Sequence, residues 1–214
     1  MKILLTGGAG YIGSILANDL LKENYTVTVL DNFMYGQASL NHLCHHEKFN
    51  VIKGDVRDLS LIRGLIKEHD VIIPLAALVG APLCNFNKVG ARTVNHDSII
   101  ALLREVSVNQ LILMPTTNSA YGSGDDKNMC DEASELRPLS NYAIDKVEVE
   151  KKLMEHPNSI SFRLATVFGM SPRMRLDVSV NMLTYQALRS GKITVFGGNQ
   201  TRPNIHIKDI GEYK

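Results

Sequence analysis

The chain has 214 residues, a formal net charge of +1 and 44% hydrophobic residues. This length allows one large domain, or one domain and part of another. The near-neutral charge gives no sign of the basic surface that binds nucleic acid, and no apolar stretch is long enough to cross a bilayer. Cys44, Cys84 and Cys130 are too widely spaced for a CxxC metal pair or a disulfide framework. With no signal-peptide pattern at Met1, we expect a reducing, cytoplasmic location.

A short strand is expected over residues 3–5, followed by the sequence TGGAGYIG at residues 6–13. Apolar residues then recur at helical spacing, so the order is strand, glycine turn and helix. Gly7, Gly10 and Gly13 can provide the turn, the close approach of the backbone to a phosphate, and the packing of helix on strand. The free N–H groups of the helix N-terminus favour a pyrophosphate. The pattern therefore predicts a dinucleotide site, although a βα turn without a ligand would use the same residues.

A second strand is expected over residues 26–30 and ends at Asp31. A carboxylate about 20 residues beyond the glycine turn is placed to accept hydrogen bonds from a ribose diol. An acid repels a 2′-phosphate, and no arginine occurs in residues 32–37, so NAD is favoured over NADP. The alternative is an aspartate that only ends a strand.

Residues 39–46 are expected to form a short helix that carries His42, Cys44, His45 and His46. Such a cluster could bind a metal ion. It has no carboxylate at ligand spacing and resembles a solvated face, so no metal site is predicted.

Small or polar residues follow three further expected strands. Asp55 and Val56 follow the first, where an adenine ring could be hydrogen-bonded and covered. Residues 74–77 include small residues that would let the backbone approach a ligand, and hydroxyl groups gather in residues 116–121. Because open α/β sheets bind ligands at the carboxyl ends of their strands, these segments are expected to share one site. The strands concerned are expected over residues 49–53, 70–73 and 111–114, with helices over residues 61–66 and 89–106.

Beyond a polar surface loop at residues 122–137, Pro138 is expected to begin a helix that stops before Pro157. Tyr142 and Lys146 stand four residues apart and so share one face of this helix. A free tyrosine has a pKa near 10, and a neighbouring ammonium favours the phenolate that can act as a base. The same spacing also occurs on ordinary amphipathic surface helices.

The alternation of strands and helices changes after a sixth strand, expected over residues 160–164. Arg173 and Arg175 lie in a loop that follows. A helix is then expected over residues 176–190, ended by a glycine, and a strand over residues 193–196. We therefore expect an NAD-binding domain at residues 1–169 and the beginning of a smaller, incomplete substrate-binding region at residues 170–214.

Together these segments resemble the extended short-chain dehydrogenase/reductase superfamily, and within it the NAD-dependent epimerase/dehydratase family that includes UDP-galactose 4-epimerase. The resemblance covers nearly the whole chain. It implies a doubly wound parallel sheet of the Rossmann type, which the strand and helix alternation also favours. It further implies NAD as cofactor, a nucleotide-sugar as substrate and a homodimer joined through two helices per subunit. The matching positions are residues 6–13, Asp31, Asn32, residues 54–58, residues 75–77, Asn95, Thr117, Tyr121, Gly122, Tyr142, Lys146, Arg202 and residues 206–209.

The resemblance assigns a role to each matching residue. Tyr142 would be the catalytic acid/base, and Lys146 would bind the nicotinamide ribose and lower the pKa of Tyr142. Thr117 would hydrogen-bond the reacting hydroxyl of the sugar, and Arg202 would bind the diphosphate of the nucleotide-sugar. The cofactor would be bound by Gly7, Gly10, Tyr11 and Ile12 at the pyrophosphate, Asp31 and Asn32 at the adenosine ribose, Asp55 and Val56 at the adenine, Leu75, Ala76 and Ala77 along the cleft, and by Asn95, Tyr142 and Lys146.

Two departures from the family pattern bear on the reaction. Family dehydratases carry an Asp-Glu pair directly after the catalytic threonine, whereas this chain has Asn118 and Ser119, so dehydration is not expected. Thr166 stands near the place of an asparagine that often contacts substrate, which leaves the sugar unidentified. The expected activity is epimerisation of a nucleotide-sugar through a transient keto intermediate. The alternatives are a nucleotide-sugar reductase or dehydrogenase, and an NAD-binding module without turnover.

Overall fold

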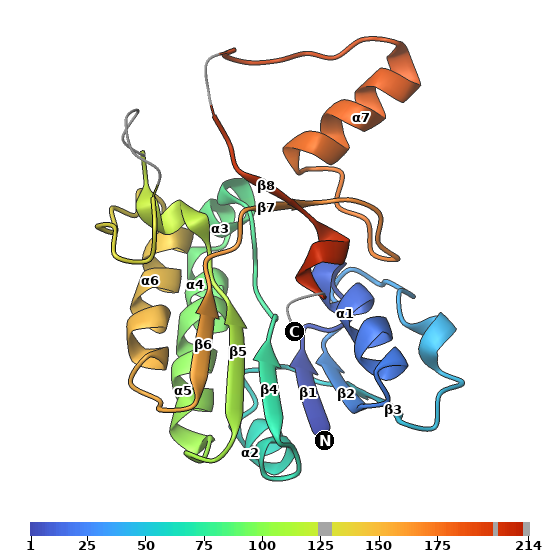
Figure 1. Ribbon diagram of the computed structural model, residues 1–214, viewed down its shortest axis with the longest axis vertical. Helices are drawn as coiled ribbons and strands as arrows, with labels where there is room; N and C mark the ends of the chain where they lie inside the picture. Colours follow the sequence, from blue (N-terminus) through green and yellow to red (C-terminus); the bar gives the residue numbers. More distant parts are fainter. Residues whose placement is uncertain (124–129, 199–200, 212–214) are drawn as a thin grey trace.

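The computed structural model describes residues 1–123, 130–198 and 201–211. Within these residues, six parallel strands form the main sheet in the order β3-β2-β1-β4-β5-β6 (Figure 1). The chain winds from β1 to one edge of the sheet and then from β4 to the other, which confirms the predicted doubly wound architecture. The strands are β1 (Lys2–Thr6), β2 (Thr26–Asp31), β3 (Phe49–Lys53), β4 (Val71–Pro74), β5 (Leu111–Pro115) and β6 (Ser159–Phe162).

Two apolar cores lie on opposite faces of the sheet, because successive side chains of a strand point to opposite sides. Leu4 of β1 packs with Ile72 of β4 in one core, and Leu5 packs with Val29 of β2 in the other. The first core is covered by α2 (Leu59–Lys67), α5 (Ser98–Glu105) and α6 (Asn141–Leu153), and the second by α1 (Tyr11–Lys22) and the 3-10 turn η1 (Asn41–Leu43).

Several helices differ from the sequence expectation. Helix α6 begins at Asn141 rather than at Pro138, because the Ser140 hydroxyl caps it by accepting a hydrogen bond from the Ala143 amide at 3.2 Å. Only η1 forms within residues 39–46. The long helix expected over residues 89–106 consists of α4 (Lys88–Arg92), a π-helical turn (Thr93–Asp97) and α5, and it is preceded by the unexpected α3 (Ala81–Phe86).

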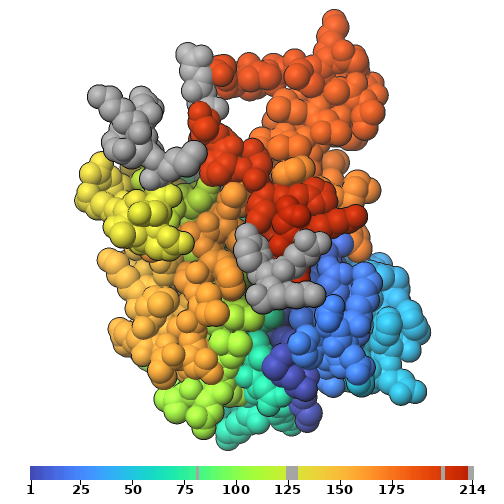
Figure 2. Space-filling model, in the orientation of Figure 1, coloured from blue at the N-terminus to red at the C-terminus, as the bar shows by residue number. Residues whose placement is uncertain are grey.

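The C-terminal region, residues 169–198 and 201–211, is attached to this sheet by a second, small one. Strand β7 (Thr166–Phe168) pairs in parallel with β8 (Asn204–His206), and the 3-10 turn η4 (Ile207–Ile210) then packs on α1. Helix α7 (Ser179–Ser190) ends at the left-handed Gly191, as predicted. The prediction of a strand over residues 193–196 is wrong, since these residues form no strand and are exposed. Figure 2 shows α7 and the segment after it projecting from the rest of the molecule.

The loop expected at residues 122–137 lies in part outside the described residues. No helix in the described part of the chain is long and apolar enough to cross a membrane.

Candidate active site

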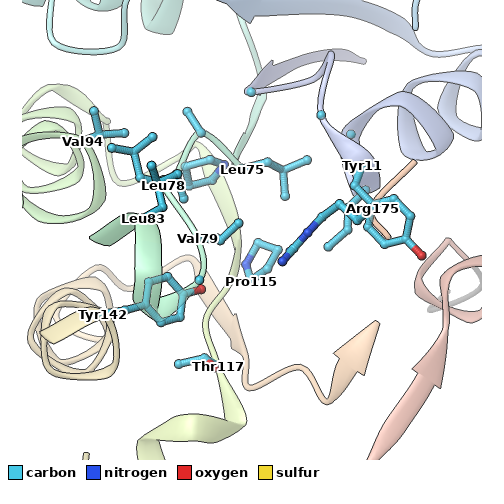
Figure 3. A pocket seen from close by; sticks show the side chains of 18 of the residues that line it. Tyr11, Leu75, Leu78, Val79, Leu83, Val94, Pro115, Thr117, Tyr142 and Arg175 are labelled. Atoms are coloured by element: carbon cyan, nitrogen blue, oxygen red, sulfur yellow. The ribbon is translucent and has the colours of Figure 1, made fainter. Parts of the chain in front are cut away.

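A cavity of about 950 Å³ lies at the carboxyl ends of the strands, where the strand order reverses between β1 and β4. This is the edge at which open α/β sheets bind ligands. The segments that follow all six strands of the main sheet contribute to its wall, together with α6 and residues of the C-terminal region (Figure 3). Every predicted site residue lines this cavity except Asn95 and Arg202.

The glycine turn is built by close backbone contacts. Gly7 has a φ of +72°, and its amide donates to the Leu30 carbonyl at 2.7 Å. A Cβ at Gly7 would lie 2.5 Å from the Ala76 nitrogen, and a Cβ at Gly13 would lie 2.6 Å from the Gly8 Cα, so neither position accepts a side chain without displacement. No side chain caps the N-terminus of α1. The positive end of this helix is therefore open to an anion in the cavity.

Two carboxylates lie at the end of the cavity that the segments after β2 and β3 form. The Asp31 carboxylate accepts hydrogen bonds from the amides of Ala9 at 3.0 Å and Phe33 at 2.8 Å, one on each oxygen. Each oxygen keeps a further lone pair for a ribose hydroxyl. Asp55 is bound by Arg57 through two contacts of 2.8 and 2.6 Å, and these hydrogen bonds lower the pKa of Asp55 to about 2. The charge of Arg57 is thus already matched, which fits a ribose diol rather than a 2′-phosphate.

The other end of the cavity carries the predicted catalytic residues. Figure 3 shows Tyr142 and Thr117 on the same side of the cavity. The Thr117 hydroxyl accepts a hydrogen bond from the Ser119 amide at 3.1 Å, which leaves its hydrogen free to donate. Lys146 is buried one helical turn beyond Tyr142, and no hydrogen bond or ion pair joins its ammonium to any residue that the structure describes. A buried ammonium without a partner, at a cavity wall, is expected to be satisfied by a ligand.

Burial dominates the pKa values of this pair. Loss of solvent raises the pKa of Tyr142 to about 12, an effect that the Arg175 charge partly offsets. Loss of solvent also lowers the pKa of Lys146 to about 8, against the opposing effect of the Asp145 carboxylate. Desolvation of the phenolate thus outweighs the nearby positive charge of Arg175, and the lowering of the Tyr142 pKa by Lys146 stays a prediction.

A buried polar network supports the catalytic end and was not predicted. The Glu150 carboxylate accepts from the Thr116 hydroxyl at 2.9 Å and from the Arg163 guanidinium at 2.6 Å. Arg163 in turn donates to the Tyr121 hydroxyl at 3.0 Å. The network fastens the segment after β5 to α6. A signal for it was present in the sequence, since Glu150 stands four residues after Lys146 and so shares the face of α6 that carries the site.

The two predicted residues outside the cavity have different surroundings. Asn95 is fully buried, and its side-chain amide makes two hydrogen bonds of 2.8 Å with the backbone N–H and carbonyl of Leu78, so it fixes the segment after β4. Arg202 is exposed. Two arginines that received no role from the sequence, Arg173 and Arg175, do line the cavity. Figure 3 shows Arg175 extending across it between Tyr11 and Pro115.

These features fit a bound dinucleotide. An uncapped helix N-terminus can meet the pyrophosphate, Asp31 can meet one ribose, and the unpartnered Lys146 can meet the other. Among the described residues, no group of three His, Cys, Asp or Glu side chains gathers closely enough to hold a metal ion. The fold and the site therefore define a dinucleotide-dependent enzyme with a Rossmann-type sheet.

Comparison with known proteins confirms the predicted family and its dependence on NAD. Residues 3–213 match the NAD dependent epimerase/dehydratase family, and the chain belongs to this family. A Bacillus subtilis (strain 168) protein, the uncharacterized UDP-glucose epimerase YtcB, is 32% identical over 98% of this chain and 70% of its own length. UDP-glucuronic acid decarboxylase 1 of Xenopus tropicalis is 28% identical over 98% of this chain, which spans 51% of the decarboxylase.

Solved structures agree with the fold. The crystal structure of UDP-glucuronic acid 4-epimerase from Bacillus cereus, in complex with UDP-glucuronic acid and NAD, superposes with a TM-score of 0.85 at 28% identity. The alignment covers 98% of this chain and 70% of the epimerase.

Proposed function

We propose that this chain catalyses the epimerisation of a nucleotide-sugar through a transient keto intermediate, with NAD regenerated in each cycle. The observation that carries the proposal is the convergence of Thr117, Tyr142 and Lys146 on the cavity that begins at the glycine turn. Similar proteins include UDP-sugar epimerases and a UDP-glucuronic acid decarboxylase, which supports a nucleotide-sugar as the substrate.

When bound, NAD supplies the acceptance and return of hydride. The phenol oxygen of Tyr142 takes the proton of the reacting sugar hydroxyl and later returns it. The Thr117 hydroxyl donates to the same sugar oxygen and so fixes it while the ketone forms. Lys146 binds the nicotinamide ribose through its ammonium. Because the pKa of Tyr142 is about 12, its phenolate is a minor form at neutral pH, and the positive charge of Arg175 reduces the cost of forming it.

The remaining assignments belong to the same proposal. The amides of Tyr11 and Ile12 meet the pyrophosphate, and Gly7 and Gly10 let the backbone approach it closely, with the Gly10 amide donating to the Gly7 carbonyl at 3.1 Å. Asn95 acts indirectly through Leu78. Residues 1–169 bind the cofactor, and residues 170–214 contribute to the binding of the sugar nucleotide, where Arg202 meets the diphosphate. A homodimer and a cytoplasmic location complete the proposal. Asn118 and Ser119 line the cavity where family dehydratases carry two acids, which weighs against dehydration.

The test is an NMR assay of the purified chain with NAD and a panel of UDP-, dTDP-, GDP- and CDP-hexoses. Conversion of one sugar to a stereoisomer without net NADH is the expected result, and it would also name the substrate. Net consumption of the cofactor would instead indicate a reductase or dehydrogenase. Binding of NAD with no conversion of any sugar would indicate a cofactor-binding module without turnover.

The matched variants are Tyr142→Phe and Tyr185→Phe. Tyr142→Phe removes the proton-transferring hydroxyl and should lower turnover by about 10²- to 10⁴-fold while NAD still binds. Tyr185 is exposed on α7 and lies outside the cavity, so loss of its hydroxyl should leave turnover unchanged. Full activity of Tyr142→Phe would overturn the mechanism.

A further inference from the structure

The backbone of Tyr11 belongs to the glycine turn, but the hydroxyl of its side chain bonds to the C-terminal region. Its hydroxyl donates to the Gly169 carbonyl at 2.8 Å and accepts from the Asn181 side-chain amide at 3.1 Å. Figure 3 shows this hydroxyl pointing away from Tyr142. The first residue of α1 is thus bonded to the C-terminal region, 170 residues further along the chain.

Asn181 extends this connection. It is the buried residue of α7, its Oδ1 accepts from the Gly169 amide at 3.0 Å, and its Nδ2 also donates to the Arg175 carbonyl at 2.9 Å. The Ser171 hydroxyl adds a contact of 2.7 Å to the Tyr11 carbonyl. These bonds hold the segment from Gly169 to Arg175 against the N-terminus of α1. The position of the Arg175 backbone therefore depends on two side chains, Tyr11 and Asn181.

The Arg175 side chain leaves this segment and enters the cavity. It is 25% exposed, and its guanidinium pairs at 2.6 Å with Asp177, which is 63% exposed. A pair with an exposed carboxylate two residues away contributes little free energy. The planar guanidinium can therefore turn to an anionic ligand at small cost, and its fork of N–H groups matches two phosphate oxygens.

Other cations of the described cavity wall are engaged differently. Arg57 is bound by Asp55, and Arg173 donates to the Met174 carbonyl and stacks 4.5 Å above the Tyr35 ring. Lys146 is buried in the face of α6. Arg175 instead spans the cavity between the glycine turn and the segment after β5 (Figure 3).

We propose that Arg175 binds a diphosphate from within the cavity, in addition to the exposed Arg202, and that the Tyr11 hydroxyl and Asn181 are its positioning groups. The proposal deepens the proposed function, on which it rests for the nature of the ligand. Both NAD and a nucleotide-sugar carry a diphosphate, so the shared chemistry is a pyrophosphate dianion bound by a guanidinium. Binding measurements distinguish the two sources.

The first experiment is calorimetric titration of the full chain with NAD, and then with UDP at saturating NAD, at several salt concentrations. Arg175→Gln should raise the Kd of one of these ligands by about 10- to 100-fold, as expected for a lost charge-assisted hydrogen bond, and should weaken its salt dependence. The affected ligand identifies the diphosphate that Arg175 meets. If Arg175→Gln changes neither Kd by more than about twofold, the proposal is overturned.

The second experiment tests the positioning groups. Tyr11→Phe deletes one oxygen atom and should raise the Kd of the same ligand by about 3- to 10-fold. Combined with Arg175→Gln it should add nothing further, since both changes remove one interaction. Asn181→Ala should behave in the same way. Tyr185→Phe deletes the same atom from an exposed site on α7 and should match the unmodified chain.

A purely structural role predicts a different pattern. Tyr11→Phe would then weaken both ligands alike and add to the effect of Arg175→Gln, and either result would overturn the positioning role. The outcome is independent of turnover. If the NMR assay finds no epimerisation but Arg175→Gln still weakens the binding of a diphosphate, the proposed function fails and this inference stands.

Discussion

The sheet body, residues 1–123 and 130–168, and the C-terminal region differ in how they are held in place. In the sheet body, strands such as β4 are wholly buried and two cores cover the opposite faces of the sheet. In the C-terminal region, Asn181 is the buried residue of the twelve in α7. A small cluster of Tyr11, Val167 and Ile207 joins the two parts. The sheet body thus carries the proposed catalytic residues on or next to its packed elements, whereas the C-terminal region places its arginines through a few specific hydrogen bonds.

The largest effect is expected from Glu150→Ala, which removes a buried ion-pair partner from the sheet body. The change leaves the largely covered Arg163 guanidinium, whose side chain is 18% exposed, without its carboxylate and should lower the free energy of unfolding by about 3 to 5 kcal/mol. Chemical denaturation followed by circular dichroism measures it. The control is Glu135→Ala, whose pair with Arg137 is exposed on both sides, and it should be close to neutral. Equal losses for the two variants would show that the Glu150 network does not brace the site.

Two glycines with similar backbone angles allow a comparison across the regions. Gly7 has a φ of +72° and Gly191 a φ of +66°. A Cβ at Gly7 would collide with the Ala76 backbone at 2.5 Å, whereas a Cβ at Gly191 would have no heavy atom within 4 Å. Gly7→Ala should therefore cost about 2 to 4 kcal/mol from strain and overpacking together, and Gly191→Ala about 1 kcal/mol from strain alone.

Thermal unfolding of both variants gives the difference. Gly7→Ala should also abolish measurable NAD binding, because the turn must shift. If the two variants unfold alike, the close contact at Gly7 does not determine the shape of the turn.

The same division explains what the sequence could predict. Strands of the sheet body were predictable because their apolar runs are bounded by local turn signals. Many of the cavity-lining residues were predictable because they follow strand ends, and Tyr142 and Lys146 because they share one face of a helix. The alternation around Ile193 and Val195 predicted a strand wrongly. A strand needs a hydrogen-bonded neighbour, and none pairs with this segment among the described residues. The roles of Asn181 and Arg175 depend on contacts with Tyr11, which no local pattern encodes.

A smaller effect is expected from the ionisation of Lys146 in the sheet body. Its pKa in the folded chain is about 8, against an ordinary value of 10.5. Between these values the unfolded chain binds more protons than the folded chain, so the free energy of unfolding should rise with pH. Below pH 8 both states are protonated, and the full cost of burial is present. Relative to Lys146→Met, the unmodified chain should gain roughly 1 to 2 kcal/mol between pH 8 and pH 10.

Denaturation of both proteins at the two pH values gives this difference. The raised pKa of Tyr142 acts in the opposite sense, because the folded chain retains that proton longer, but only above its ordinary value of 10. Parallel pH curves for the two proteins would mean that Lys146 is not buried as an ammonium.

The smallest effect is expected from Phe196→Ser in the C-terminal region. Phe196 is 86% exposed, so the change removes almost no apolar surface from contact with the protein. The free energy of unfolding should change by no more than about 0.5 kcal/mol, as measured by denaturation with urea. A loss above about 1 kcal/mol would mean that the segment after α7 packs on a core of its own. The C-terminal region would then be an independently stabilised unit, and the hydrogen bonds of Tyr11 and Asn181 would not be needed to place Arg175.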